Sequence, residues 1–161
     1  MYTTVSIAHR LPVTPEVHEL STLDRVDYAD AFAVDVGGAG ALTAEEWARA
    51  MLEGAPLRTR TTLLSGWTAL GLKLAIGDPE AVLGWRIRQV TPDLLLVGAD
   101  GRIGLSAELL FRRAGDELHF STFVRIAGPA ATLAWAGIEH RHDVVVRSLL
   151  ERVHQPDPAE A

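Results

Sequence analysis

The feature that most constrains this chain is a change of hydrophobic period near Gly128. Before it, four segments between Trp85 and Ile126 alternate apolar and polar residues, and short turns such as Asp100-Gly101 join them. Alternation with period two is typical of strands with one buried face, and turns this short connect antiparallel neighbours. After Pro129 the apolar residues recur at steps of three and four instead. The sequence therefore predicts an antiparallel meander followed by a long amphipathic helix.

The residues before the meander predict one more strand and two helices. The segment YADAFAVDV from Tyr28 alternates as a half-buried strand does. A helix is expected from Ala44, because the Ser/Thr-x-x-Glu capping box that begins at Thr43 directly precedes it. A second helical pattern begins at Leu57 and ends at Gly77, the first residue of a sequence that favours a turn. Strands and helices in this order predict an α+β protein.

A run of glycines between the first strand and the first helix raises the question of a phosphate-binding loop. Gly38 and Gly40 begin the pattern G-x-G-x-x-G, but Thr43 stands where the third glycine belongs, and no lysine lies nearby. Glu45 and Glu46 follow in the first helical turn, where they stabilise the positive end of the helix and repel a phosphate. The run is interpreted as a flexible connection into a capped helix, and no cofactor is expected.

The amino-acid composition limits the kinds of partner and chemistry that are expected for this protein. The chain of 161 residues has 48% hydrophobic residues, a net charge of -6 and no cysteine. This size and hydrophobicity predict a single globular domain, and the negative charge argues against a nucleic-acid surface. Without cysteine there is no disulfide and no thiolate catalyst or thiolate metal site. The sequence contains neither a signal-peptide pattern nor an apolar run long enough for a bilayer, so a cytoplasmic protein without membrane insertion is expected.

Three segments are expected along the chain. Residues 1–26 contain Pro12 and Pro15 and no sustained period, which predicts an irregular lead-in. Residues 27–154 contain all the strands and helices predicted above and form the domain. Residues 155–161 are polar and rich in proline, which predicts a disordered tail.

Three segments, DYADAFAV, TAEEWARAML and IEHRHDVVVRSLL, together with the order of elements, carry a resemblance to a known superfamily. Over about residues 27–153 the chain resembles the helix-grip, or START-like, superfamily of polyketide cyclases and lipid-transfer proteins, and it is most similar to an uncharacterised bacterial branch. His142 takes the place of a histidine that precedes the final apolar turns in that branch. The resemblance implies a curved antiparallel sheet of about five or six strands that wraps around the C-terminal helix, with two helices between the first strand and the meander.

In the implied fold, the inner sheet face and the C-terminal helix leave a space between them. The candidate ligand-binding residues are therefore the strand residues that face this space and the residues along the apolar side of the C-terminal helix. They are Trp85, Ile87, Leu105, Leu109, Phe111, Phe120, Thr122, Val124, Trp135, Ile138 and His142. Burial alone also explains most of these apolar positions, so core packing is the competing interpretation.

His142 interrupts the apolar stripe of the last helix, and histidine is the residue type whose ordinary pKa suits acid-base catalysis near neutral pH. A structural histidine bonded to a backbone carbonyl also fits this position, and it is favoured because the sequence assigns His142 no catalytic partner. Glu139 and His142 share a helix face at the spacing of di-metal sites, but no second motif of this kind occurs, and His140 points to the other side. No metal site is expected.

Three functions remain open. The first, which the apolar inner parity favours, is a non-catalytic module that binds a small hydrophobic or aromatic molecule. The second is a polyketide cyclase or dehydratase that uses His142 as acid-base, oriented by Thr122 or Glu139. The third is a homodimeric interaction protein in which exposed apolar surface meets a second copy. A cluster of polar groups around His142 inside a pocket favours the enzyme, whereas a histidine bonded only to backbone contradicts it.

Overall fold

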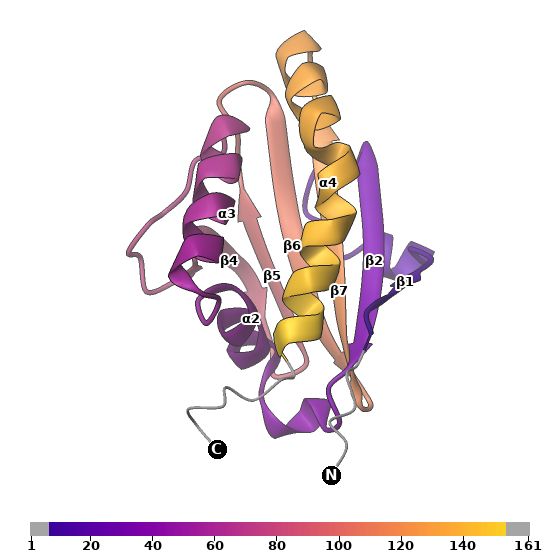
Figure 1. Ribbon diagram of the computed structural model, residues 1–161. Coiled ribbons are helices and arrows are strands. Elements are labelled where there is room, and N and C mark those ends of the chain that lie inside the picture. Colours follow the sequence, from indigo (N-terminus) through magenta and orange to yellow (C-terminus); the bar gives the residue numbers. More distant parts are fainter. Residues whose placement is uncertain (1–6, 154–161) are drawn as a thin grey trace.

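The strands form one sheet, and the three long helices lie on one of its faces (Figure 1). The computed structural model describes residues 7–153. The strands pair antiparallel in the spatial order β1-β2-β7-β6-β5-β4-β3. They are β1 (His9–Leu11), β2 (Tyr28–Asp35), β3 (Ala81–Val82), β4 (Trp85–Val90), β5 (Leu94–Ala99), β6 (Leu105–Ala114) and β7 (Glu117–Ile126). The helices are α1 (Pro15–His18), the 3-10 turn η1 (Ala39–Ala41), α2 (Ala44–Leu52), α3 (Leu57–Ala69) and α4 (Pro129–Val153). The chain is thus an α+β protein with a seven-stranded antiparallel sheet and a long C-terminal helix.

The predicted meander is present as β4 to β7, which pair in sequence order. The connection after β5 differs from the tight Asp100-Gly101 turn that the sequence predicts, because it spans residues 100–104. Glycine is needed at position 101 for a close approach: an added Cβ would lie 1.7 Å from the backbone oxygen of Leu105. At this position glycine therefore admits the start of the next strand rather than a two-residue turn.

The sheet has seven strands, which is more than the five or six expected. The additional strands are β1, with three residues, and β3, with two, and they form the two edges of the sheet. Segments this short do not display an alternating pattern, so periodicity could not reveal them. β1 and α1 both lie in the lead-in, which therefore contains regular structure where an irregular segment was expected.

The helices begin where the sequence predicts. The capping box is confirmed: the Glu46 backbone N donates to Thr43 Oγ1 (3.1 Å), and the Thr43 backbone N donates to Glu46 Oε1 (3.0 Å). α3 ends at Ala69, earlier than the pattern toward Gly77 predicts, because Gly71 turns the chain with a φ of 79°. Within residues 7–153, no helix combines the length and the hydropathy that a bilayer span requires.

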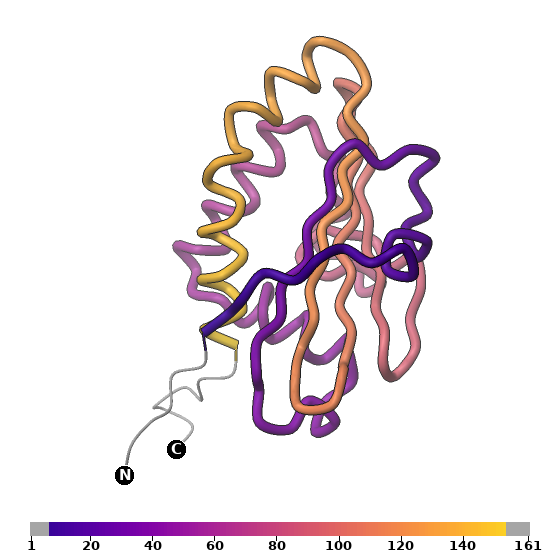
Figure 2. The backbone as a smooth tube through the Cα atoms, turned by 90° about the vertical axis from the view of Figure 1, so that its right-hand side faces the viewer, coloured from indigo at the N-terminus to yellow at the C-terminus, as the bar shows by residue number. Residues whose placement is uncertain are grey.

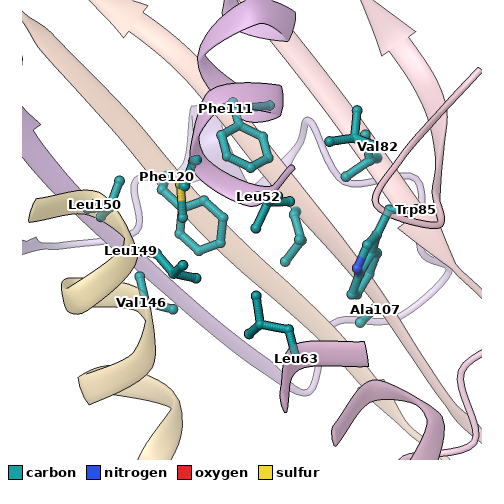
Figure 3. Packing of buried hydrophobic residues seen from close by; sticks show 14 of the residues in the cluster. Leu52, Leu63, Val82, Trp85, Ala107, Phe111, Phe120, Val146, Leu149 and Leu150 are labelled. Atoms are coloured by element: carbon teal, nitrogen blue, oxygen red, sulfur yellow. The ribbon is translucent and has the colours of Figure 1, made fainter. Parts of the chain in front are cut away.

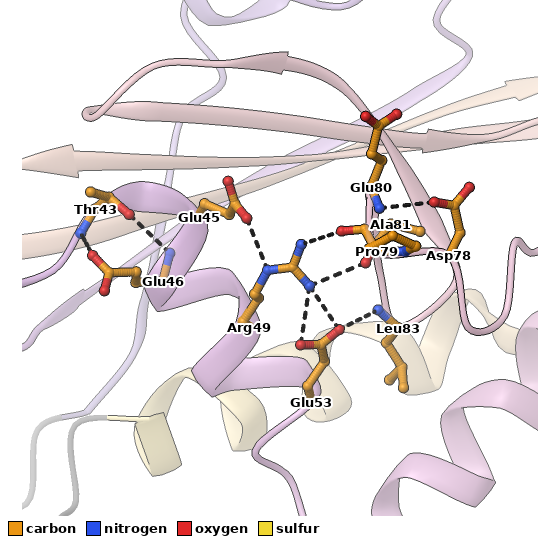
Figure 4. A network of polar contacts seen from close by, with 10 residues as sticks. All are labelled: Thr43, Glu45, Glu46, Arg49, Glu53, Asp78, Pro79, Glu80, Ala81 and Leu83. Carbon is orange, nitrogen blue, oxygen red and sulfur yellow. Dashed lines mark hydrogen bonds and ion pairs between the residues drawn. The ribbon is translucent and has the colours of Figure 1, made fainter.

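Arg49 joins α2 to the segment before β3 (Figure 4). Its guanidinium donates to the carboxylates of Glu45 (3.0 Å) and Glu53 (3.0 Å). It also donates to the backbone oxygens of Pro79 (3.1 Å) and Ala81 (3.2 Å). Burial by itself lowers the pKa of Arg49, but the hydrogen bonds to the two carboxylates outweigh it and raise the pKa. A charged Arg49 therefore holds the edge strand β3 against α2.

The main core lies between the three long helices and the sheet face that they cover, called the inner face below (Figure 3). Phe111 and Phe120 meet edge to face within it, with ring centroids 5.1 Å apart. Trp85 of β4 lies on one side of this pair and Leu149 of α4 on the other. Among the residues of α3, Leu63 alone is buried. α3 is therefore the helix with the weakest anchor in the core.

The opposite, outer face is covered by the lead-in (Figure 2). Residues 12–26 cross it, and Val17 packs there with Leu96, Leu110 and Phe123 in a second apolar cluster. The expectation that the meander buries only one face is therefore wrong for the centre of the sheet. The reason is a contact between distant segments, which strand periodicity does not report.

Glu108 on β6 shows how the lead-in is attached. Its side chain points to the outer face, where the alternation predicts solvent, but it is fully buried. The carboxylate accepts hydrogen bonds from Ser21 Oγ (2.6 Å) and from the Thr22 backbone N (2.9 Å). It also accepts from the Thr22 hydroxyl and from Arg88 Nη1 (2.9 Å). One cation and three polar donors thus compensate the buried charge and fix the lead-in to the sheet.

Candidate functional site

His142 of α4 contacts two neighbouring strands of the inner face. Its Nε2 lies 3.1 Å from Asp30 Oδ2 on β2 and 3.1 Å from Thr122 Oγ1 on β7. Asp30 and Thr122 are directly paired in the register of the two strands. Three segments that are distant in the sequence therefore meet at one imidazole nitrogen.

Asp30 is a carboxylate without contact to solvent. Its Oδ2 accepts a hydrogen bond from the Tyr28 hydroxyl (2.7 Å), and its Oδ1 accepts one from the Thr122 backbone N (3.2 Å). Together with His142, these donors satisfy the buried carboxylate. Burial, and then the hydrogen bond and the charge of Asp30, raise the pKa of Tyr28 far above its ordinary value. The phenol therefore stays protonated and remains a donor.

Aromatic rings hold the imidazole in place. The ring centroids of Trp135 and His142 lie 5.5 Å apart, and those of Tyr28 and His142 lie 6.0 Å apart at 84°. Tyr28 and Trp135 are themselves in contact, with centroids 4.8 Å apart. Because both rings touch the imidazole and each other, the orientation of His142 is fixed by packing as well as by hydrogen bonds.

The cluster has the geometry of an acid-base pair. The Asp30 carboxylate only accepts, so Nε2 of His142 carries the hydrogen of their contact, and in the neutral imidazole Nδ1 keeps its lone pair. Nδ1 has no hydrogen-bond partner among residues 7–153, and the His142 side chain is 16% exposed. An imidazole held in this way presents the Nδ1 lone pair as a base, and Asp30 fixes its tautomer.

The candidate residues from the sequence lie on the inner side of the sheet. The main core includes, or packs against, Trp85, Ile87, Leu105, Leu109, Phe111, Phe120, Val124, Trp135 and Ile138. Thr122 and His142 belong to the polar cluster. Of the two residues proposed to orient His142, Thr122 contacts it, whereas Glu139 is exposed and makes no hydrogen bond to it. That these residues bind a ligand stays a prediction.

Sequence reasoning missed Asp30 and Tyr28 as members of the site. The signal was present, because Asp30 has the parity of Tyr28, Phe32 and Val34 and so interrupts the inward apolar set of the first predicted strand. An acid in such a position points into the core and needs donors there. Its partner His142 interrupts the apolar stripe of α4 in the same way.

The inner face between α3 and α4 is almost closed by packing. Leu63, Leu109 and Trp135 on this face are at most 8% exposed, whereas the His142 side chain is 16% exposed. Three surface hollows, of about 360, 280 and 190 Å³, lie elsewhere on the molecule, and none of these is lined by Trp135 or His142.

Comparisons with known proteins give no match: no family model, no curated protein and no solved structure matches this chain. Arguments about function therefore rest on the contacts and the geometry described above.

Proposed function

We propose that the protein is a helix-grip module that binds a small hydrophobic or aromatic molecule between the inner sheet face, α3 and α4. The main support is the composition of this face, which is apolar apart from one hydrogen-bonded cluster at His142. Small-molecule sites are mostly apolar and contain a few polar groups that set the ligand's orientation. The position of α4, packed against β2, β6 and β7, agrees with the helix-grip assignment.

α3 is the element that opens the site in this proposal. Leu63 is its one buried residue, and Trp67 adds an edge-to-face contact with Trp85, with ring centroids 5.3 Å apart. Burial of one leucine side chain contributes about 2 kcal/mol, which a local opening can overcome. Gly66 within the helix weakens it further. In this proposal, displacement of α3 gives a ligand access to the inner face.

Native mass spectrometry of the purified protein, before and after denaturation, tests this proposal. A small molecule that is released only on denaturation is the expected result. The same spectra give the subunit count and so test the homodimer hypothesis.

A titration with 2-naphthol, followed by quenching of tryptophan fluorescence, tests the site itself. Ala107→Leu fills the inner face and should weaken binding, whereas Ala136→Leu, on the exposed side of α4, should not. A protein that carries no molecule and does not bind 2-naphthol contradicts the proposal. Equal binding by the two variants contradicts the location.

The Asp30–His142 pair favours a second candidate, acid-base catalysis of the cyclase or dehydratase kind. The 3.1 Å contact gives His142 the buried carboxylate partner that a histidine base uses. A β-diketone presented as an N-acetylcysteamine thioester is a suitable substrate probe. Conversion should be lost in His142→Gln and Asp30→Asn and kept in His140→Gln, which changes an exposed neighbour. Absence of conversion by the unchanged protein leaves the binding module as the function.

A further inference from the structure

The hollow of about 190 Å³ lies on the outer face of the sheet, beneath the lead-in. Its floor consists of Ala31 on β2, His119 and Ser121 on β7, and Arg112 on β6. Its walls are Leu11, Pro12, Thr14 and Val17 of the lead-in. The sheet separates it from His142, so it is a different place from the site proposed above.

Two polar groups of this hollow have no partner in the described part of the chain. Arg112 is partly buried, yet it makes no ion pair or hydrogen bond with any residue between 7 and 153. Ser121 is only 4% exposed, and its hydroxyl likewise makes no hydrogen bond within those residues. Both groups line the same hollow and neither has a partner among these residues, so a single ligand in the hollow can satisfy both.

The chemistry of the lining selects the ligand class. A guanidinium binds a carboxylate through two parallel hydrogen bonds, and a serine hydroxyl can add a third. Leu11, Val17 and Ala31 give the rest of the hollow an apolar surface. A volume of about 190 Å³ is below the roughly 300 Å³ at which pockets for drug-sized ligands begin, so the ligand is small.

We propose that this hollow binds a small organic carboxylate. The carboxylate group lies on Arg112 and Ser121, and the hydrocarbon part packs between the floor and the lead-in residues Leu11 and Val17. Glu117 is the acid that contacts the lining, and its charge is directed to two imidazoles: its carboxylate lies 3.2 Å from His119 Nε2 and 3.8 Å from His9 Nε2. The Glu117 carboxylate therefore does not form an ion pair with Arg112.

The other two hollows do not combine these features. In the hollow of about 280 Å³, Arg88 is already bonded to Glu108 and Asp100, and the remaining cations Lys73 and Arg86 are exposed. In the hollow of about 360 Å³, the hydrogen bonds of Arg49 described above already satisfy its guanidinium, and Arg60 Nε donates to the backbone oxygen of Ala55 (3.0 Å). The hollow beneath the lead-in is distinguished by an unpaired cation next to apolar walls.

Calorimetric titration of the full chain with butyrate and benzoate tests the proposal, with benzamide and inorganic phosphate as comparison compounds. Both carboxylates should bind, and neutral benzamide and phosphate should not. Arg112→Gln should weaken carboxylate binding about tenfold or more, because it removes the bidentate contact. Ser121→Ala should weaken it by a smaller factor. Arg86→Gln removes an exposed cation from the same face and should leave binding unchanged.

Two further measurements distinguish loss of the binding site from loss of the fold. Thermal midpoints show whether Arg112→Gln is folded, and if it is not, Ala31→Val replaces it, because it fills the floor without a change in charge. Loss of benzoate binding in Ala31→Val supports the site. The proposal is overturned if neither carboxylate binds, if folded Arg112→Gln or Ala31→Val binds as well as the unchanged protein, or if phosphate binds as tightly as benzoate, which indicates a charge effect only.

Discussion

At the scale of single residues, the stability of the polar cluster depends on how many donors reach Asp30. Tyr28→Phe removes one of the three donors but keeps the ring against Trp135. Because the buried carboxylate then lacks a partner, we expect the free energy of unfolding to fall by about 1–3 kcal/mol. Urea unfolding measures this. In an Asp30→Asn background the same substitution should cost less, and equal costs in both backgrounds would show that the two side chains do not interact.

Glu46 carries a pH-dependent part of the stability. The Thr43 backbone N–H, and then the Thr43 side chain, lower the pKa of Glu46 below its ordinary value. Such a group stabilises the fold above its unfolded pKa, and the contribution is lost as the pH falls through the lower folded pKa. The unchanged protein should therefore exceed Glu46→Gln in stability at pH 7, and the difference should shrink below about pH 4. A difference that is constant between pH 7 and pH 3 in urea unfolding contradicts this.

The alternation of inward and outward positions along the predicted elements identified part of the site and missed the rest. Thr122 and His142 were found because each is a polar residue at an inward position of a predicted element. Asp30 was missed although it has the same signature, because a buried acid requires hydrogen-bond donors and the strand pattern does not identify them. The hydrogen bonds between these residues join segments up to 112 positions apart, and no local pattern reports which of them meet.

At the scale of elements, Gly98 of β5 keeps Arg88 in place. A Cβ at Gly98 would lie 2.3 Å from Arg88 Nε, so the guanidinium must move in Gly98→Ala and leave Glu108. Loss of a hydrogen bond to this buried charge should lower the free energy of unfolding by about 2 kcal/mol. Gly137→Ala is the matched control, since nothing lies within 4 Å of its added Cβ and a helical glycine is replaced. It should raise stability by about 0.5–1 kcal/mol.

Elements whose signal is local were predicted well. The alternating strands of the meander, the capping box at Thr43 and the start of α4 depend on patterns within a few residues of the chain. The edge strand β1 and the long connection at residues 100–104 depend on pairing with more distant segments, whereas the two residues of β3, which pair with the neighbouring β4, are too few to show a period. The fold class was therefore within reach of the sequence, and the strand count was not.

At the scale of the whole molecule, the lead-in should be required to protect the outer face. Val17→Asp replaces the apolar contact with Leu96 and Phe123 by a charged group in that cluster. We expect a lower thermal midpoint and fast hydrogen exchange in residues 12–26. Val144→Asp, at an exposed position of α4, is the control for the same change and should leave both quantities unchanged. Slow exchange in Val17→Asp would show that the hydrogen bonds of Glu108 hold the lead-in without the apolar cluster.

The attachment of Ala8 has a consequence for how the chain is made. Its backbone N donates to Glu151 (3.1 Å), and its backbone O accepts from Arg147 (2.9 Å), so the start of the lead-in is fastened to the last turns of α4. Residues 8 and 151 are 143 positions apart, which at about 5–20 residues per second takes roughly 7–30 s to translate. The lead-in, which is translated before the rest of the sheet and α4, is thus among the last of these segments to reach its final place. Until then, the apolar centre of the outer face is available to chaperones and to neighbouring nascent chains.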